Sequence, residues 1–455
     1  MRIPFREKFA YGLGDVGNNL LFNLGQIYLL KFYTDSLGLP PAWAGMVFLF
    51  TKIFFAFTDV AVGTWIDRRK NYGKYGKFRT VMFYAVIPLA LCTAVSFYNP
   101  DFTLTGKIVW AYFSYTLFGV VYTFFNIPFG SSIPAATKDP IDRAGIASAR
   151  QFGGSVGLLV VMVAFVPLVT ICSSQLGEQY GFFVAAGVIA IAGGAMQWLC
   201  AHGIRERYVE PPKLKEANIS VWKSYRDGLS NAPMLVLSLV NLFTFSAFNV
   251  KLAVQVYYCQ YVLHNIDISS LYGFFSVGGI ILGVSCVQPM VRRYGKKITY
   301  ISGIVVWAVA DILALFFVND TVSFVIFASL AFFGSGFTAL NWAFISDAIE
   351  YGEWKTGYRS EGTIYSLFIF FRKISQAVAG FVPGIVLAMV GYVANQEYQT
   401  ETAIEGIRGL MFMYSGVMAV ATVLVMAFGY KLTDQRYQEI MTDLNQRKAS
   451  SCRLQ

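Results

Sequence analysis

Long apolar stretches alternate with short polar gaps along the whole chain. Each stretch has roughly 20 residues or more, which is enough to cross the hydrocarbon core of a bilayer as a helix. The pattern therefore predicts an all-α polytopic membrane protein. We expect twelve transmembrane helices at 9–35, 41–66, 79–98, 108–135, 145–172, 180–202, 231–262, 267–290, 298–317, 323–346, 361–392 and 404–430.

Positive charge is concentrated in alternate gaps between these stretches. The basic gaps are 67–79, 138–143, 205–226, 292–297, 355–359 and the tail from 431, whereas 175–180, 264–267, 319–321 and 394–402 contain no Lys or Arg. Short basic loops stay in the cytoplasm. We therefore expect a multi-pass protein of the bacterial inner (plasma) membrane with both termini cytoplasmic.

The longest basic gap divides the chain into two similar halves. We expect a six-helix bundle at 1–202, a cytoplasmic middle loop at 203–230, a second six-helix bundle at 231–430 and a cytoplasmic tail at 431–455. A weak repeat supports this division, because Arg68, Arg69 and Lys77 follow the second span of one half and Arg292, Arg293 and Lys297 follow the second span of the other. Two parallel six-helix halves are typical of the major facilitator fold.

Composition narrows the possible partners. Hydrophobic residues make up 56% of the chain and charged residues only 14%, against about a quarter in ordinary soluble proteins. The net charge of +10 lies in loops beside the spans, so it favours membrane lipid with anionic head groups over nucleic acid. Six cysteines without paired spacing and two histidines indicate neither disulfides nor a metal site. We expect no enzyme activity and no cofactor.

Charged residues within the spans are functional candidates, because burying them in a membrane is costly. Lys52 and Asp59 lie seven residues apart in the second span, on one helical face. They form either a structural ion pair with a neighbouring helix or an ion-coupling site, in which Lys52 modulates the protonation of Asp59. The fifth span contributes Arg150.

The second half supplies further polar side chains. Lys251, Gln255 and Tyr258 form one polar stripe on the seventh span, which we expect to line a cavity. Arg372 and Lys373 are adjacent in the eleventh span and diverge by about 100° around the helix. One of the two is expected to bind substrate, and the other to pair with a carboxylate or a helix end.

Two uncharged residues have two readings each. Asn126 precedes Pro128, so it either satisfies a carbonyl freed by the proline or binds a sugar hydroxyl. Trp342 is either an interfacial anchor or a stacking platform.

The spans hold several cations against one clearly buried carboxylate, Asp59, with Asp15 near a span end. An excess of buried cations predicts an anionic ligand.

Charged residues at the inner ends of both halves are candidates for a gate. A network of salt bridges among them would hold the cytoplasmic side closed. The residues are Asp67, Arg68, Asp347, Glu350 and Arg359.

Three motifs spread along the chain carry a family resemblance. They are Tyr351-Gly-Glu-Trp-Lys-Thr-Gly357, Tyr11-Gly-Leu-Gly-Asp15 and Asn126-Ile-Pro128. The sequence resembles the glycoside–pentoside–hexuronide cation symporters, and within them the enteric permeases for sulfoquinovose and dihydroxypropanesulfonate. The resemblance implies a major facilitator fold and sugar transport. It also implies sugar contacts at Asn19, Asn126, Arg150 and Lys373.

The same resemblance implies cation ligands at positions 55, 58 and 59 and at Thr123. Here the chain departs from the sodium-binding pattern, since Phe55 replaces a carboxylate and Thr58 replaces an amide. We therefore expect a co-transported proton rather than Na⁺, coupled through Asp59. A carboxylate that is dry in one state and wet in another binds a proton differently in each.

We interpret the chain as a monomeric secondary transporter that imports an anionic sugar by alternating access. Sulfoquinovose or a related sulfonated sugar is the leading substrate, and a hexuronide or glucuronide is the alternative. An uncoupled facilitator or exchanger is a third reading. An integral-membrane transferase would need a carboxylate cluster at a membrane face, and Asp347, Glu350 and Glu353 fit a gate better.

Overall fold

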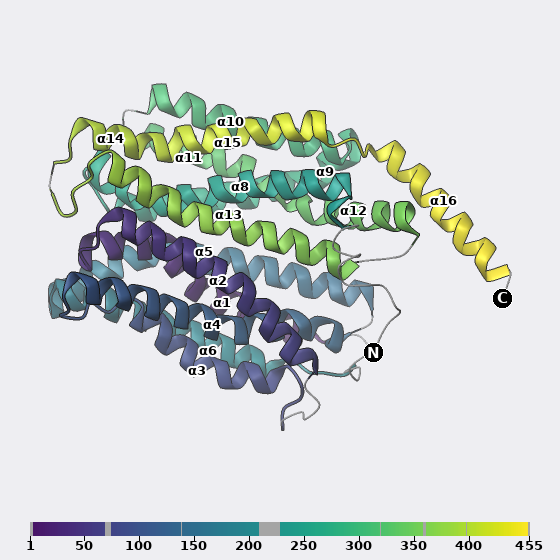
Figure 1. The fold of residues 1–455 in the computed structure, drawn as a ribbon, viewed down its shortest axis with the longest axis horizontal. Helices are drawn as coiled ribbons and strands as arrows, with labels where there is room; N and C mark the ends of the chain where they lie inside the picture. The colour runs from purple at the N-terminus through teal and green to yellow at the C-terminus, as the bar shows by residue number, and fades with distance from the viewer. Residues whose placement is uncertain are drawn as a thin grey trace. The chain divides into compact units, whose positions relative to one another are not determined.

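The computed structural model describes residues 3–68, 74–137, 139–208, 228–318, 320–357, 361–396 and 398–453. The described chain is built from helices joined by short turns (Figure 1). A helix lies over each of the twelve predicted spans. The bounds in the first half are α1 Phe5–Lys31, η1 Phe32–Ser36, α2 Pro41–Arg68, α3 Arg79–Val95, α4 Leu104–Ala136, α5 Pro140–Leu176 and α6 Glu178–Gly203.

The second half continues the same pattern with more interruptions. Its bounds are α8 Ala232–Tyr257, η2 Tyr258–Val262, α9 Ile268–Tyr294, α10 Lys296–Phe317, α11 Thr321–Ser335, η3 Gly336–Leu340, α12 Asn341–Thr356, α13 Glu361–Met389, α14 Glu401–Arg408, η4 Gly409–Tyr414, α15 Ser415–Leu424, η5 Val425–Gly429 and α16 Asp434–Arg453. The helix of the tenth span runs on to Thr356, so Asp347 and Glu350 lie on a helix rather than at its end.

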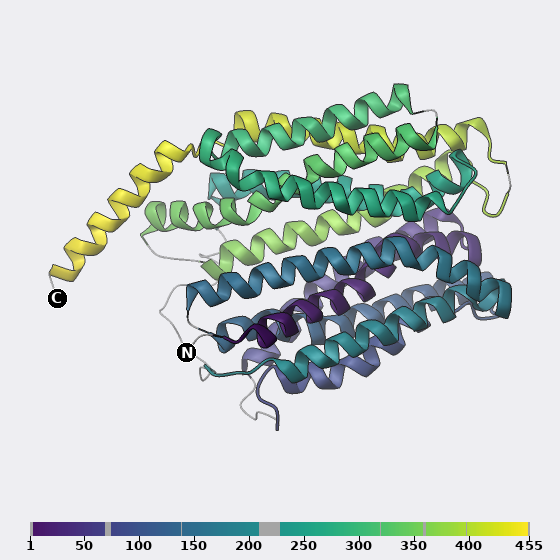
Figure 2. The same cartoon turned by 180° about the vertical axis from the view of Figure 1, so that it is seen from behind.

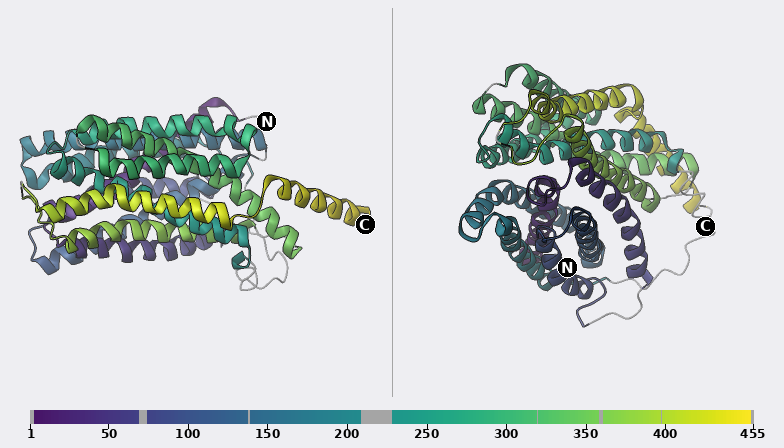
Figure 3. Two further views of the ribbon diagram at one scale, coloured as in Figure 1. Left: turned by 90° about the horizontal axis from the view of Figure 1, so that it is seen from above. Right: turned by 60° about the vertical axis from the view of Figure 1, so that its left-hand side comes forward.

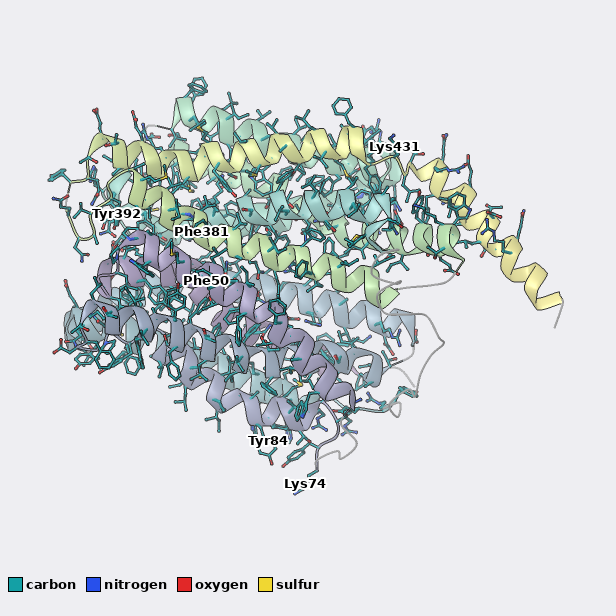
Figure 4. The ribbon with its side chains drawn as sticks, in the orientation of Figure 1. Phe50, Lys74, Tyr84, Phe381, Tyr392 and Lys431 are labelled. Carbon is teal, nitrogen blue, oxygen red and sulfur yellow. The ribbon has the colours of Figure 1, made fainter. Side chains whose placement is uncertain are left out.

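Ten of the described helical segments are long and apolar enough to cross a membrane. The third predicted span is a shorter apolar helix, Arg79–Val95, and the first, α1, is long but more polar. Large apolar side chains on the helix surfaces are exposed, including Tyr84, Ile191 and Phe316 at 79%, 72% and 71%. Tyr84 points away from its helical bundle (Figure 4). Such a surface suits lipid rather than water.

The described chain forms two compact units. The first comprises Met1–Glu216, Leu252–Val277 and Gly380–Ile407. In it α1 packs on α5 and α6, α3 packs on α4 and α6, and α2 packs on α4. Figures 1 and 2 show α1 to α6 side by side in this bundle. Lys74 and Tyr392 lie at its opposite ends (Figure 4).

The second unit comprises Ala217–Lys251, Gly278–Ala379 and Arg408–Gln455. In it α10 packs against α11 and α15, and α16 packs against α12 (Figure 3). Trp307, Tyr300 and Phe344 are fully buried in its apolar core. Ile440 and Leu444 of α16 belong to the same core, so this part of the predicted tail is a docked helix.

A close helix crossing sets the geometry of the first unit. A Cβ atom placed on Gly153 of α5 would lie 2.1 Å from the carbonyl oxygen of Gly12 on α1. Small residues at such crossings let two backbones approach closely in a membrane. The crossing brings α1 and α5 together one turn from Arg150.

Candidate functional site

Polar side chains of α1, α4 and α5 meet inside the first unit. The Asn18 amide donates to the Tyr122 hydroxyl at 2.8 Å and to Asn126 Oδ1 at 3.2 Å. Arg150 forms an ion pair with Asp15, and its guanidinium lies 4.3 Å from the centre of the Phe129 ring. The predicted residues Asn126 and Arg150 are therefore part of one polar layer, to which Asn18 and Asp15 also belong.

Asn19 lies beside this layer on α1. Its amide donates to the carbonyl of Asp15 at 2.9 Å, and Asn23 donates to its Oδ1 at 3.4 Å. Asn126 Oδ1 accepts from the Asn18 amide. A carbonyl freed by Pro128 would instead take the N–H of the Asn126 amide, so this bond leaves both readings of Asn126 as predictions.

The candidate coupling residue Asp59 faces α4. The Thr123 hydroxyl has two acceptors within reach of its single hydrogen, Asp59 Oδ1 at 2.7 Å and the carbonyl oxygen of Gly119 at 3.0 Å. Thr58 instead donates to the carbonyl of Phe55 at 3.0 Å. The structure thus brings Asp59 and Thr123 together, while the Thr58 hydroxyl is engaged within its own helix.

Lys52, on the same helix as Asp59, is buried among aromatic rings of neighbouring helices. Its ammonium donates to Gln26 Oε1 at 2.7 Å and lies 4.7 Å from the centre of the Phe22 ring and 5.6 Å from that of Tyr115. The side chain is only 3% exposed. An ammonium in such a cage is held by ring quadrupoles, so Lys52 places a positive charge two turns from Asp59.

Lys251 in the second unit is neutralised by a carboxylate that sequence analysis missed. It forms an ion pair with Asp311 of α10, and both side chains are fully buried. Trp307 Nε1 donates to Asp311 at 2.9 Å and to Ser415 at 3.0 Å. The expectation of one clearly buried carboxylate in the spans was wrong, because Asp311 lies hidden in the apolar run 308–316.

The polar stripe of α8 continues past Lys251 into the first unit. Gln255 and Tyr258 are fully buried there. Within the described part of the chain, the Gln255 amide has no hydrogen-bond partner. A buried amide without a partner is costly, so Gln255 stays a candidate for contact with a polar ligand.

Arg372 and Lys373 are half-buried on α13. The Arg372 guanidinium lies 4.3 Å from the centre of the Phe245 ring and 6.0 Å from that of Trp342. Trp342 is 45% exposed and also contacts the Phe368 ring. The Trp342 ring therefore lies beside a cation, and its role as an anchor or a stacking platform stays a prediction.

The predicted gate residues of the second unit contact other groups of that unit. Asp347 pairs with Lys296, and the Tyr437 hydroxyl of α16 donates to Glu350. Next to them, the Trp354 indole donates to Asp443 at 2.7 Å. The indole hydrogen bond and then Arg447 hold the pKa of the Asp443 carboxyl below its usual range. The side chains of Asp67 and Arg68, and the whole of Arg359, lie outside the described residues.

A second carboxylate that sequence analysis missed, Asp35, lies in the first unit. The Asp35 carboxylate accepts from Lys31 and Thr34 at 2.6 Å, from Tyr392 at 2.8 Å and from Tyr261 at 3.0 Å. The segments it joins are η1, η2 and the turn after α13. Interruptions of this π-helical kind often mark functional sites.

No group of three or more His, Cys, Asp or Glu side chains is placed to hold a metal ion among the residues searched. The first unit offers amides, hydroxyls, the Arg150–Asp15 pair and the Asp59 carboxylate opposite Thr123. In the second unit, Arg372 lies beside two aromatic rings. Amides and hydroxyls suit the hydroxyl groups of a sugar, and guanidinium groups suit an anionic oxygen.

Comparison with known proteins identifies the family. The family model described as "MFS/sugar transport protein" matches residues 10–434. The chain belongs to this major facilitator family. Its members and the relatives below are transporters, so this is a multi-pass membrane transporter for a small sugar-like molecule and not an enzyme.

Two relatives cover nearly the whole transporter. One, from Salmonella typhimurium, is named "Putative 2,3-dihydroxypropane-1-sulfonate exporter" and is 45% identical over 98% of this chain and 97% of its own. The other, from Escherichia coli K12, is named "Putative sulfoquinovose importer" and is 44% identical over 98% of this chain and 95% of its own.

A solved structure supports the fold of this transporter. The inward-facing, occupied bacterial homologue of the human lysosomal transporter Spinster has a TM-score of 0.65 and covers 95% of this chain and 97% of its own. The two sequences are only 14% identical, so the likeness concerns the fold alone.

Proposed function

We propose that this transporter imports a sulfonated sugar across the bacterial inner membrane by alternating access, with both termini in the cytoplasm. The observation that carries the proposal is the similarity, at 44–45% identity over almost the whole chain, to two relatives whose names both specify a sulfonate. Each unit offers groups that suit this chemistry. The first offers Arg150 for sulfonate oxygens and Asn18, Asn19 and Asn126 for hydroxyl groups, and the second offers Arg372 for sulfonate oxygens.

Coupling to protons is the second part of the proposal. Asp59 and Thr123 offer one carboxylate and one hydroxyl at the candidate ion site, and Phe55 contributes no oxygen. A metal cation needs several oxygen ligands, whereas a proton needs one. The fixed charge of Lys52 on the same helix also disfavours a second cation nearby.

Uptake by proteoliposomes tests the proposal. Radiolabelled sulfoquinovose should accumulate when the vesicle lumen is alkaline relative to the outside, and replacing K⁺ by Na⁺ should change nothing. Accumulation of glucuronate or of neutral glucosides in preference to sulfoquinovose would contradict the substrate.

Export is a second candidate, favoured by the relative named as an exporter of 2,3-dihydroxypropane-1-sulfonate. A counterflow experiment separates the two substrates. Vesicles loaded with unlabelled three-carbon sulfonate should drive little uptake of labelled sulfoquinovose if the six-carbon sugar is the substrate. Strong exchange of the three-carbon compound with itself, and weak exchange of sulfoquinovose, would favour the three-carbon sulfonate as the substrate.

A further inference from the structure

Four aromatic rings form a continuous row on the surface of the first unit, where α3 and α6 pack together. The ring centres of Tyr75 and Phe83 lie 4.8 Å apart, and those of Phe83 and Trp198 lie 6.3 Å apart. His202 stacks on Trp198 with 5.6 Å between the ring centres. Tyr75 is 46% exposed and Trp198 is 49% exposed. This aromatic row therefore runs along the surface from the turn before α3 to the end of α6.

Two basic side chains lie beside the aromatic row. The ammonium of Lys74 lies 5.9 Å from the centre of the Tyr75 ring, and Lys74 is exposed. Arg79 Nε donates to the carbonyl of Ala201 at 2.8 Å, and its Nη2 donates to that of His202 at 3.1 Å. A guanidinium has five N–H donors, and these two hydrogen bonds to described residues use two of them. The end of α6 thus holds the Arg79 guanidinium in place and leaves it donors for a further acceptor.

The carboxylate that reaches the same place is turned toward the backbone. Glu206 accepts from the backbone N–H groups of Lys77 and Arg79, both at 2.7 Å, and from that of Phe78 at 2.9 Å. It thereby satisfies N–H groups at the start of α3 that have no partner within the helix. The three cations Lys74, Lys77 and Arg79 outnumber this one carboxylate, so the surface around them is positively charged.

Farther along the same two helices, the exposed side chains are aliphatic. On α3, Ile87 and Leu91 follow Phe83 by one and two turns and are 69% and 61% exposed. On α6, Ile191 precedes Trp198 by two turns and is 72% exposed. Residues at these spacings share one face of a helix. The surface therefore presents, in order, cations, aromatic rings and aliphatic side chains.

We propose that this surface binds an anionic phospholipid of the inner leaflet, with its phosphate on Arg79 and Lys74. Guanidinium and ammonium groups pair with phosphate oxygens, and Trp and Tyr rings favour the head-group level of a bilayer. The aliphatic side chains suit the acyl chains, and the order of the three zones matches the order within a lipid. The basic gap 67–79 is the side expected in the cytoplasm, and anionic lipid is concentrated in that leaflet. The assignment is independent of which sugar the transporter carries.

Two lipids with identical acyl chains provide the probe. Phosphatidylglycerol carries a net negative charge, whereas phosphatidylethanolamine carries the same phosphate with a compensating ammonium. Native mass spectrometry of the purified full-length transporter, titrated with each lipid, gives the affinity of the first lipid bound. The ratio of the phosphatidylglycerol affinity to the phosphatidylethanolamine affinity is the readout, and the wild type should prefer phosphatidylglycerol. A purely structural defect would weaken both lipids and leave the ratio unchanged.

Four substitutions test the cationic part of the site. Lys74→Gln and Arg79→Gln should each lower the ratio about fivefold, the effect of one basic side chain near a membrane surface. Arg79→Lys keeps the charge and should restore most of the ratio. Lys431→Gln is the matched control, because Lys431 is also exposed but belongs to the second unit (Figure 4). This control should leave the ratio unchanged.

Trp198→Leu tests the aromatic row. It should weaken both lipids to a similar extent, because an indole at the head-group level does not distinguish their net charges. Trp43→Leu is its control, since Trp43 is 46% exposed on α2 and lies outside the row. Equal losses of lipid affinity in the two variants would overturn the role of the row.

Selectivity between the two lipids decides whether the assignment is correct. Equal affinity of the wild type for both lipids would overturn it, as would a ratio that survives both Lys74→Gln and Arg79→Gln. An equal fall of the ratio in Lys431→Gln would show that the net charge of the protein, and not this surface, selects the lipid. Displacement of phosphatidylglycerol by inorganic phosphate would show a site for a free anion instead of a lipid.

Discussion

Asp59 is the residue on which proton coupling depends in our proposal, and its contact with Thr123 gives a direct test. Asp59→Asn keeps the size and the hydrogen-bonding capacity of the side chain but removes its ability to take up a proton. We expect uphill accumulation to be abolished while exchange of substrate across the membrane continues. Paired uptake and counterflow measurements on the same vesicles check this.

Thr123→Val is the companion variant, since it removes the hydroxyl that contacts Asp59 but keeps the carboxylate. It should slow proton-driven uptake without abolishing accumulation. Accumulation that survives Asp59→Asn, or Na⁺-stimulated uptake at fixed pH in the wild type, would show that the coupling assignment is wrong.

The pair Lys251–Asp311 makes a different kind of prediction, about stability. Removing one partner of a buried ion pair leaves an uncompensated charge and costs about 3–5 kcal/mol, whereas replacing both by apolar residues is often nearly neutral. Lys251→Met should therefore lower the thermal unfolding midpoint strongly. The double variant Lys251→Met/Asp311→Leu should recover most of the loss.

Substrate affinity distinguishes this structural role from the ligand-binding role expected for Lys251. If Lys251 only balances Asp311, the stable double variant should bind sulfoquinovose like the wild type. A double variant that is stable but no longer binds the sulfonated sugar would return Lys251 to the substrate site.

At the scale of helices, the crossing of α1 and α5 explains why Arg150 and Asp15 meet. A methyl group on Gly153 would overlap the Gly12 carbonyl oxygen at 2.1 Å, so Gly153→Ala must push the two helices apart. We expect a loss of about 1–3 kcal/mol in stability and weaker sugar binding. Thermal unfolding and binding of the purified variant measure both.

Gly130→Ala is the matched control for this crossing. Gly130 lies in α4, and nothing would meet its added methyl group within 4 Å. Because alanine is the better helix former, this variant should be as stable as the wild type or slightly more stable. Equal effects of the two substitutions would argue that the crossing does not set the site.

Helices were easier to predict than their partners. A described helix lies over each predicted span, because each span must satisfy its own backbone hydrogen bonds in lipid. Ten of these helices are long and apolar enough to cross a membrane. Hydropathy did not reveal that Ile440 and Leu444 dock α16, since a short amphipathic helix after the last span resembles a polar tail. Family resemblance assigned Asn126 and Arg150 to the sugar and Asp59 and Thr123 to the cation.

Pairing within the site could not be read from the chain. Asp311 is 60 residues from Lys251 and sits in a run of apolar neighbours, so neither periodicity nor motif signals the contact. Asp35 was passed over for a related reason, because it falls at the end of a span where a charge needs no explanation. Its partners Tyr261 and Tyr392 come from segments more than 200 residues away.

For the whole molecule, the distribution of Lys and Arg predicts which loops face the cytoplasm. Single cysteines placed at His264 and Gln399, in a background without the native cysteines, should react in intact cells with a maleimide that cannot cross the membrane. A cysteine at Lys74 should react only after the cells are opened. Labelling of position 74 from outside would reverse the topology.

The Lys251–Asp311 pair also has a consequence for how the protein is made. Ribosomes add about 5–20 residues per second, so the 60 residues between the two charges take about 3–12 s. During that time α8 has already left the ribosome with Lys251 but without Asp311. Inserting this lysine into lipid without its partner would cost about 2.5–3.5 kcal/mol. We therefore expect α8 to stay beside the insertion machinery until α10 arrives with its aspartate, so that the two helices enter the bilayer as a neutral pair.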